Sequence, residues 1–240
     1  MAMKICLTND DGIFAEGMMV LANWAKKLGD VTIVAPKTQQ SGKAHSIELH
    51  DAFEVKQVEH PTGLRAFSVD STPADCVRVA LIGLNETYDL IISGVNCGYN
   101  LGREIIYSGT VGAALEASVH GINGLAISTG FDTFKGAAAC LDKAWDYIQQ
   151  HKLLDKNLVW NVNIPEDPAG GIRLTRQGGR YFSDDFTWDG NKIKATGKCV
   201  WTPSDDEHID TNAVLLHRQI SITPIGNDRT SQEVLNELNK

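Results

Sequence analysis

Short apolar runs alternate regularly with longer amphipathic segments along this chain, and this alternation leaves few possible folds. The runs have the length of buried strands, and the longer segments repeat apolar residues at helical spacing. In the first half, strands are predicted over residues 4–7, 31–35, 90–93 and 125–129, and helices over 16–28 and 110–120. Right-handed β-α-β units of this kind form a parallel sheet covered on both faces. The pattern therefore predicts an α/β fold with a mostly parallel sheet.

The second half begins in the same way and then changes character. A helix is predicted over residues 135–151, and strands over 158–164 and 220–223. Short alternating runs at 172–175 and 192–195 suggest β-hairpins. We expect one domain over residues 1–240. Its predicted parts are a core at about 1–176 and 211–230, a β-rich excursion at about 177–210 and a C-terminal helix at 231–240.

Composition excludes several classes of protein. With 42% hydrophobic and 22% charged residues, the 240-residue chain has an ordinary globular composition. Thirty acidic against 22 basic side chains give a net charge of −8. This balance argues against a nucleic-acid polymer as partner, because binding to a phosphate backbone requires excess Lys and Arg. The five cysteines form no C-x-x-C pair, which argues against a structural zinc site.

No segment has the features of a signal peptide or a transmembrane helix. The first residues lack a basic region followed by a long apolar run, and no stretch reaches 18 uncharged apolar residues. We therefore expect a cytoplasmic protein without a membrane partner.

Adjacent carboxylates follow the first predicted strand. Ligands of parallel sheets bind at the carboxyl ends of the strands, where Asp10 and Asp11 stand. Two neighbouring carboxylates repel each other unless a cation or a shared proton lies between them. Carboxylate oxygens suit Mg²⁺ or Mn²⁺, which leave further positions to water and substrate phosphate. The alternative is an ordinary solvated Asp-Asp-Gly turn.

A second candidate feature is the start of the helix predicted over 110–120. Ser108, Gly109 and Thr110 precede it, and the free amides of a helix start bind anions such as phosphate. The alternative is simple capping of the helix by a hydroxyl group. A cation held by carboxylates beside a phosphate-binding helix start is the arrangement that metal-assisted hydrolysis of phosphate esters requires.

Other phosphate chemistries lack their motifs. The sequence contains neither the G-x-x-x-x-G-K-[ST] phosphate loop nor a G-x-S-x-G nucleophile elbow. An aspartyl-phosphate mechanism would need a nucleophilic Asp two residues before Asp11, where Asn9 stands. Because an asparagine amide is a poor nucleophile, the sequence favours attack by water over a covalent intermediate.

Together, several blocks in register resemble the stationary-phase survival protein SurE family. The resemblance extends over nearly the whole chain. The blocks are residues 8–12 (Thr-Asn-Asp-Asp-Gly), 35–36, 40–42, 45–47, 72–76, 93–96, 107–114, 161–165, 175–176 and 221–224.

The resemblance implies a metal-dependent 5′-nucleotidase that hydrolyses nucleoside 5′-monophosphates, with 3′-nucleotides and short polyphosphate as further substrates. It implies a Rossmann-like core with a β-hairpin excursion, assembled as homodimers or homotetramers. One divalent cation per subunit, Mg²⁺ or Mn²⁺, would bind Asp10, Asp11, Ser41 and Asn96, with the two aspartates as the catalytic residues.

Phosphate would bind Ser108, Gly109 and Thr110, with Asn9 and Asn100 as further candidates to hold it or a nearby water.

Some readings stay open at this point. His45 could serve as a general acid or as a hydrogen-bonded structural residue. Residues 72–75 (Thr-Pro-Ala-Asp) have the pattern of a helix start. Another phosphate-releasing activity, such as polyphosphatase, would use the same site. A non-catalytic module that senses nucleotide or metal is the alternative function.

Overall fold

The computed structural model describes residues 2–239. Its centre is a nine-stranded sheet with the strand order β3-β4-β2-β1-β5-β6-β7-β11-β8. The strands from β4 to β7 in that order run parallel to one another, while β3 and β11 run antiparallel to their neighbours β4 and β7. This confirms the predicted α/β class with a mostly parallel sheet.

The helices and strands have the following bounds. The strands of the large sheet are β1 (Met3–Thr8), β2 (Gly29–Pro36), β3 (Val55–Glu59), β4 (Arg65–Val69), β5 (Leu90–Cys97), β6 (Asn123–Thr129), β7 (Val159–Asn163), β8 (Ile172–Leu174) and β11 (Ile220–Ile225). The α-helices are α1 (Glu16–Ala25), α2 (Pro73–Arg78), α3 (Gly109–Val119), α4 (Lys135–Gln150) and α5 (Gln232–Leu238). Shorter helical turns are η1 (Val79–Gly83), η2 (Gly102–Tyr107), η3 (Leu153–Asp155) and η4 (Asn212–Leu216).

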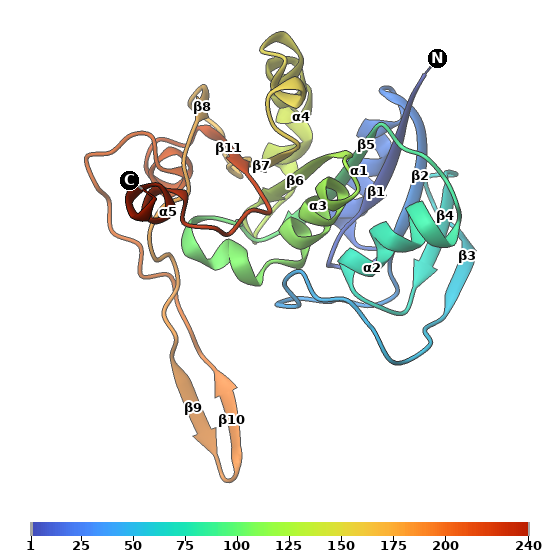
Figure 1. Cartoon of the computed structure of the whole chain (residues 1–240), viewed down its shortest axis with the longest axis horizontal. Coiled ribbons are helices and arrows are strands. Elements are labelled where there is room, and N and C mark those ends of the chain that lie inside the picture. Colours follow the sequence, from blue (N-terminus) through green and yellow to red (C-terminus); the bar gives the residue numbers. More distant parts are fainter. Residues whose placement is uncertain (1, 240) are drawn as a thin grey trace.

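Helices cover both faces of the sheet, because successive residues of a strand point to opposite faces. In β1, Ile5 and Leu7 pack with residues of α1 and α4. Cys6, between them, packs on the other side with residues of α2 and α3. Figure 1 shows α2 and α3 next to each other on the same face of the sheet. Both faces of the central strands are therefore buried, as their continuous apolar runs predict.

The second helix start noted in the sequence is confirmed. Thr72 precedes α2, its hydroxyl accepts the Asp75 N–H at 3.1 Å, and Pro73 occupies the first turn. Proline suits this position because its missing N–H would have no partner in the helix.

Two local predictions are wrong. The helix predicted over 16–28 is shorter than expected, since α1 ends at Ala25 and Gly29 already begins β2. A Cβ atom at position 29 would lie 2.0 Å from the Met3 carbonyl oxygen, so glycine allows β1 and β2 to lie close together at this point. Residues 172–174 form no hairpin but pair in parallel with β11 at the edge of the large sheet. Periodicity alone identifies a strand but not its partner.

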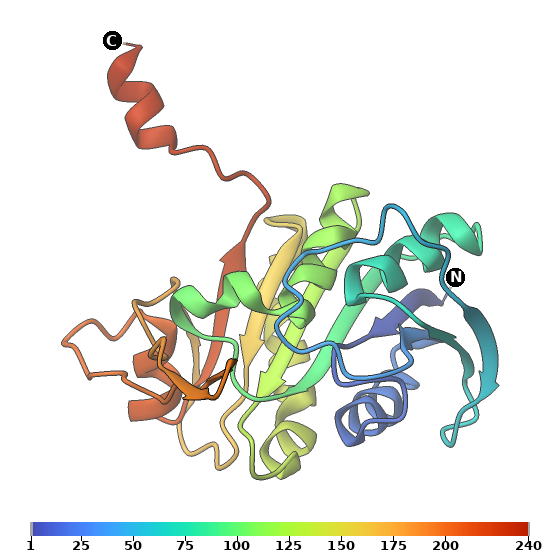
Figure 2. The same cartoon turned by 90° about the horizontal axis from the view of Figure 1, so that it is seen from below.

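Two segments leave the body of the sheet. An antiparallel hairpin, β9 (Phe186–Asp189) and β10 (Lys192–Ala195), projects from the rest of the chain (Figure 1), which confirms the predicted excursion. After β11 the chain leads away to the predicted terminal helix α5 (Figure 2), and position 240 of that prediction lies outside the described residues. Between residues 2 and 239, no helix combines the length and the apolar character needed to span a membrane.

Candidate active site

Three loops meet at the carboxyl ends of β1, β2 and β5. The Gln40 N–H, after β2, donates to the Asp10 carbonyl oxygen, after β1, at 2.7 Å. The Cys97 N–H, at the end of β5, donates to Asp11 Oδ2 at 3.0 Å. Beside these loops lies a cleft of about 670 Å³. Of the residues predicted from the sequence, the cleft is lined by Asp10, Ser41, Asn96, Asn100 and Ser108.

Asp10 is the most buried carboxylate of the cleft, with only 5% of its surface exposed. Its Oδ1 accepts a hydrogen bond from the Thr110 hydroxyl at the start of α3. Burial raises the pKa of Asp10 to about 6, the Thr110 hydrogen bond opposes this shift, and the neighbouring Asp11 charge adds to it. The side chain is thus held in an environment that disfavours a lone negative charge.

Asp11 lies beside Asp10 but outside the lining of the cleft. Both of its oxygens accept hydrogen bonds: Oδ1 from the Gln39 side chain at 3.3 Å and Oδ2 from the Cys97 N–H. Burial raises the pKa of this carboxyl group as well, and the two hydrogen bonds act to lower it. Asp11 therefore connects the ends of β1, β2 and β5.

The two carboxylates fit a hard divalent cation. Within residues 2–239, no Lys, Arg or His side chain lies within ion-pair distance of either one. Two adjacent, partly buried acids without a basic partner are stabilised by a cation that binds both. The described chain places no third His, Cys, Asp or Glu with them, so further ligands would be neutral oxygens and water.

Asn96 can supply such a neutral oxygen. Its Nδ2 donates to the Gly98 carbonyl at 2.7 Å, which orients the amide. No donor among residues 2–239 is bonded to its Oδ1, and the side chain lines the cleft. Ser41, an exposed residue, lines the same cleft from the loop after β2.

The start of α3 faces Asp10. Ser108 precedes the helix, and its Oγ accepts the Val111 N–H at 3.1 Å, as in ordinary capping. Its hydroxyl hydrogen stays available to an acceptor in the cleft. The Thr110 hydroxyl hydrogen, in contrast, is donated to Asp10. A Cβ atom at Gly109 would lie 3.0 Å from the Asp10 Cβ, so glycine lets the helix start approach this carboxylate closely.

The two asparagines predicted near the phosphate lie in different surroundings. Asn9 is fully buried, and its side chain closes the turn through hydrogen bonds with the Gly12 carbonyl and N–H. Asn100 lines the cleft, and its Nδ2 donates to Ser128 Oγ at 2.8 Å. The cleft therefore includes Asn100 but not Asn9.

Sequence reasoning missed part of the site. Asn161 and Asn163 of β7 both donate side-chain hydrogen bonds to the Asn100 carbonyl at 2.9 Å, which holds this loop on the sheet. The sequence feature that could have revealed them is the presence of two asparagines in an otherwise apolar strand. Aromatic side chains also line the cleft, and none of them was singled out from the sequence as a site residue: Tyr99, Tyr107, Phe131, Tyr181, Phe182 and Phe186.

Known proteins are similar to this chain in sequence and fold over almost their whole length. The family model "Survival protein SurE" matches residues 5–184. The 5′-nucleotidase SurE of Clostridium botulinum (strain 657 / Type Ba4) is 38% identical over 251 residues, covering 98% of this chain and 97% of the relative. The 5′-nucleotidase SurE of Desulforudis audaxviator is also 38% identical, over 99% of this chain and 97% of the relative.

A solved structure agrees with the sequence relatives. The crystal structure of the SurE protein from Aquifex aeolicus superimposes with a TM-score of 0.81 at 31% identity, covering 98% of both chains. The sheet and the cleft are thus found in a chain whose sequence and fold both match this family. The chain belongs to the SurE family.

Proposed function

We propose that this protein is a metal-dependent 5′-nucleotidase that hydrolyses nucleoside 5′-monophosphates to nucleoside and phosphate. One observation carries the proposal: the Asp10–Asp11 pair has no basic partner in the described chain and faces the start of α3. Relatives at 38% identity are named 5′-nucleotidase SurE, which supports the same reaction. 3′-Nucleotides and short polyphosphate are further substrates to test.

We propose that one Mg²⁺ or Mn²⁺ per subunit binds Asp10, Asp11, Ser41 and Asn96. When bound, the cation would activate water for attack and offset the charge of the phosphate. The raised pKa of Asp10, to about 6, supports this assignment, because a cation would relieve the cost of ionising a buried carboxyl group. The two aspartates would hold the cation, and its position would set the point from which water attacks phosphorus.

The start of α3 would orient the phosphate. Amides at a helix start and the positive end of the helix dipole favour an anion there, and the Ser108 hydroxyl has a hydrogen to donate. Charge that develops on the phosphoryl oxygens in the transition state is stabilised by the same donors. The bond from phosphorus to the sugar oxygen breaks, the water oxygen bonds to phosphorus, and a proton ends on the departing nucleoside.

The aromatic side chains of the cleft would hold the nucleobase. Phe131 lines the cleft and is 65% exposed, so its ring is accessible to a ligand. Its ring packs against Gly98, where a Cβ atom would lie 2.6 Å from a ring carbon. The next two amides, of Asp132 and Thr133, both donate to Glu166 Oε1. A ring held in place beside the cleft can stack on any base, since each base has a π-face.

We further propose that the protein assembles as a homodimer or a homotetramer. The β9–β10 hairpin carries exposed Phe186, Trp188 and Ile193, and α5 carries exposed Val234 and Leu238. Apolar side chains gathered on such projecting segments are typical of contact surfaces between subunits. Light scattering coupled to gel filtration measures the number of subunits directly.

Release of inorganic phosphate from a substrate panel tests the function. The panel holds 5′- and 3′-nucleotides and short polyphosphate, each with Mg²⁺, with Mn²⁺ and with excess EDTA. We expect release from 5′-nucleotides that EDTA abolishes and added metal restores. Release from polyphosphate alone would instead identify a polyphosphatase. Tight nucleotide binding without release under any condition would identify a sensing module.

A further inference from the structure

The loop of residues 37–54, between β2 and β3, carries Ser41 but has no helix or strand of its own. Backbone hydrogen bonds hold it on both sides of Ser41. Before it, the Gln40 N–H donates to the Asp10 carbonyl at 2.7 Å. After it, the Ala44 N–H donates to the Tyr107 carbonyl at 3.0 Å. Because one of these two bonds comes after Ser41, its position depends on how the following residues, 43–48, are held in place.

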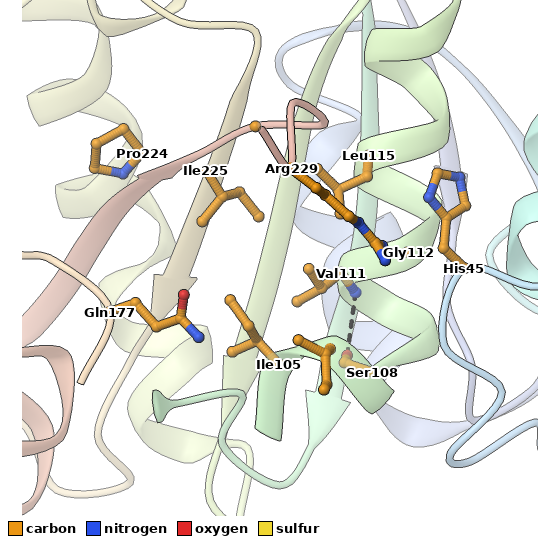
Figure 3. A pocket seen from close by; sticks show the side chains of 12 residues that line it. His45, Ile105, Ser108, Val111, Gly112, Leu115, Gln177, Pro224, Ile225 and Arg229 are labelled. Atoms are coloured by element: carbon orange, nitrogen blue, oxygen red, sulfur yellow. Dashed lines mark hydrogen bonds between the residues drawn. The ribbon is translucent and has the colours of Figure 1, made fainter. Parts of the chain in front are cut away.

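The loop lies directly on helix α3 at Gly112. A Cβ atom there would come within 2.4 Å of the Ala44 carbonyl oxygen and 3.0 Å of the His45 Cα. Figure 3 shows His45 beside Gly112, at the edge of a second hollow of about 400 Å³. His45 lines this hollow and not the cleft that contains Asp10. The geometry therefore places the imidazole ring away from the reacting groups and opposes a role as general acid.

The His45 ring is bonded to a buried carboxylate one helical turn beyond Gly112. His45 Nε2 lies 2.7 Å from Glu116 Oε2, and only 8% of the Glu116 surface is exposed. Glu116 Oε1 faces His120 Nε2 at 3.3 Å and Arg78 Nε at 3.9 Å. Burial acts to raise the pKa of Glu116, yet the hydrogen bonds from the two histidines hold it below its ordinary value.

The same group of charges also holds the far end of the loop. Arg78 donates to Asp75 Oδ1 at 3.0 Å, and Asp75 Oδ2 accepts the Glu48 N–H at 2.8 Å. Glu116 on α3 and Asp75 on α2, with Arg78 between them, thus bind the loop through His45 and Glu48. Buried charges are costly unless they are paired, so this group has a defined geometry.

We propose that Glu116 and His45 are positioning residues, which hold Ser41 beside Asp10 so that the cleft binds its cation. The inference rests on the proposed metal dependence of the site and concerns two residues that lie outside the lining of the cleft. Loss of a group bonded directly to a metal ligand costs about 10–100-fold in affinity, and since His45 acts on Ser41 through the loop, we expect an effect at the lower end of that range.

Binding of Mn²⁺ alone to the full chain, measured by calorimetry without substrate, tests the proposal. His45→Ala should weaken Mn²⁺ binding about tenfold. His45→Gln should recover most of it, because the glutamine amide can reach Glu116 in place of Nε2. His120→Ala is the matched control: it removes the other histidine from the same carboxylate but leaves the loop held. Its affinity should stay within about twofold of the wild type.

Hydrogen exchange gives a second readout that does not depend on metal. The Ala44 amide, bonded to Tyr107, should exchange faster in His45→Ala and not in His120→Ala. Equal Mn²⁺ affinity in the wild type and His45→Ala would overturn the inference, and so would an equal loss in His120→Ala. If His45→Ala does not fold, Glu116→Gln takes its place in the same two measurements and should show the same two changes. A wild type that binds no Mn²⁺ would instead overturn the proposed metal dependence itself.

Discussion

The hydroxyl of Thr110 donates a hydrogen bond to the carboxylate of Asp10, a residue 100 positions earlier in the chain. This bond joins the start of α3 to the turn that follows β1. The helix start is the candidate phosphate site and the turn is the candidate cation site. The bond therefore holds the two halves of the proposed reaction centre at a defined separation.

Asp10→Asn should abolish phosphate release while the protein stays folded. The amide is nearly the same size, but it removes the charge that the cation would balance. We expect the turnover number for a 5′-nucleotide to fall by more than about 100-fold, with an unchanged circular dichroism spectrum. Asp30→Asn, an exposed position at the start of β2, is the control and should keep full activity. Wild-type turnover in Asp10→Asn would rule out the assignment of this residue.

The same substitution should change how stability depends on pH in metal-free protein. Folding raises the pKa of Asp10 from 3.8 to about 6, so the folded state binds its proton more tightly than the unfolded state. The contribution of Asp10 to the free energy of unfolding is therefore fully present below pH 4 and is lost as the pH rises through 6. The loss amounts to about 3 kcal/mol at most.

Urea unfolding in EDTA at pH 4 to 7.5 measures this effect. Relative to the wild type, Asp10→Asn should gain stability as the pH rises, because asparagine does not titrate. Titrating groups distant from Asp10 cancel in the difference between the two proteins. A difference that stays constant across this range would show that Asp10 has an ordinary pKa in the folded protein.

Phe131→Ala should weaken the binding of nucleotides but not of phosphate esters without a base. Base–aromatic stacking contributes about 1–3 kcal/mol, so KM for AMP should rise about tenfold while KM for ribose 5-phosphate stays unchanged. Phe131→Trp should preserve the low KM. Phe14→Ala removes another exposed ring, stacked on His60 outside the cleft, and serves as the control. An equal rise for both substrates would argue against stacking.

Thr72→Ala should destabilise the protein through helix α2 and loop 37–54 together. The Thr72 hydroxyl accepts the Asp75 N–H at 3.1 Å and donates to the Ser46 carbonyl at 2.7 Å. Loss of the cap alone costs about 1 kcal/mol, measured as a lower free energy of unfolding in urea. Thr72→Ser keeps both hydrogen bonds and should retain wild-type stability. Equal stability of the alanine and serine variants would contradict the cap assignment.

Much of the fold could be predicted because its signals are local. The apolar run before Asp10 predicted β1, and the spacing of apolar residues predicted α4. The edge strand β3 and its neighbour β4 were missed because their short segments have no continuous apolar run: β3 is almost wholly exposed. Residues 172–174 were recognised as extended, but their pairing with β11 depends on contacts almost 50 positions away.

Local patterns were enough to identify the residues that could do chemistry: two adjacent carboxylates after a strand, and hydroxyls before a helix. How these groups are used depends on contacts made in the folded chain. It directs the Thr110 hydroxyl to Asp10 and leaves the Ser108 hydrogen available. It also turns His45 toward Glu116, away from the cleft. The physical reason is that these hydrogen bonds join residues 71 to 100 positions apart. Their partners are chosen by the packing of α2 and α3 on the sheet, which no local pattern encodes.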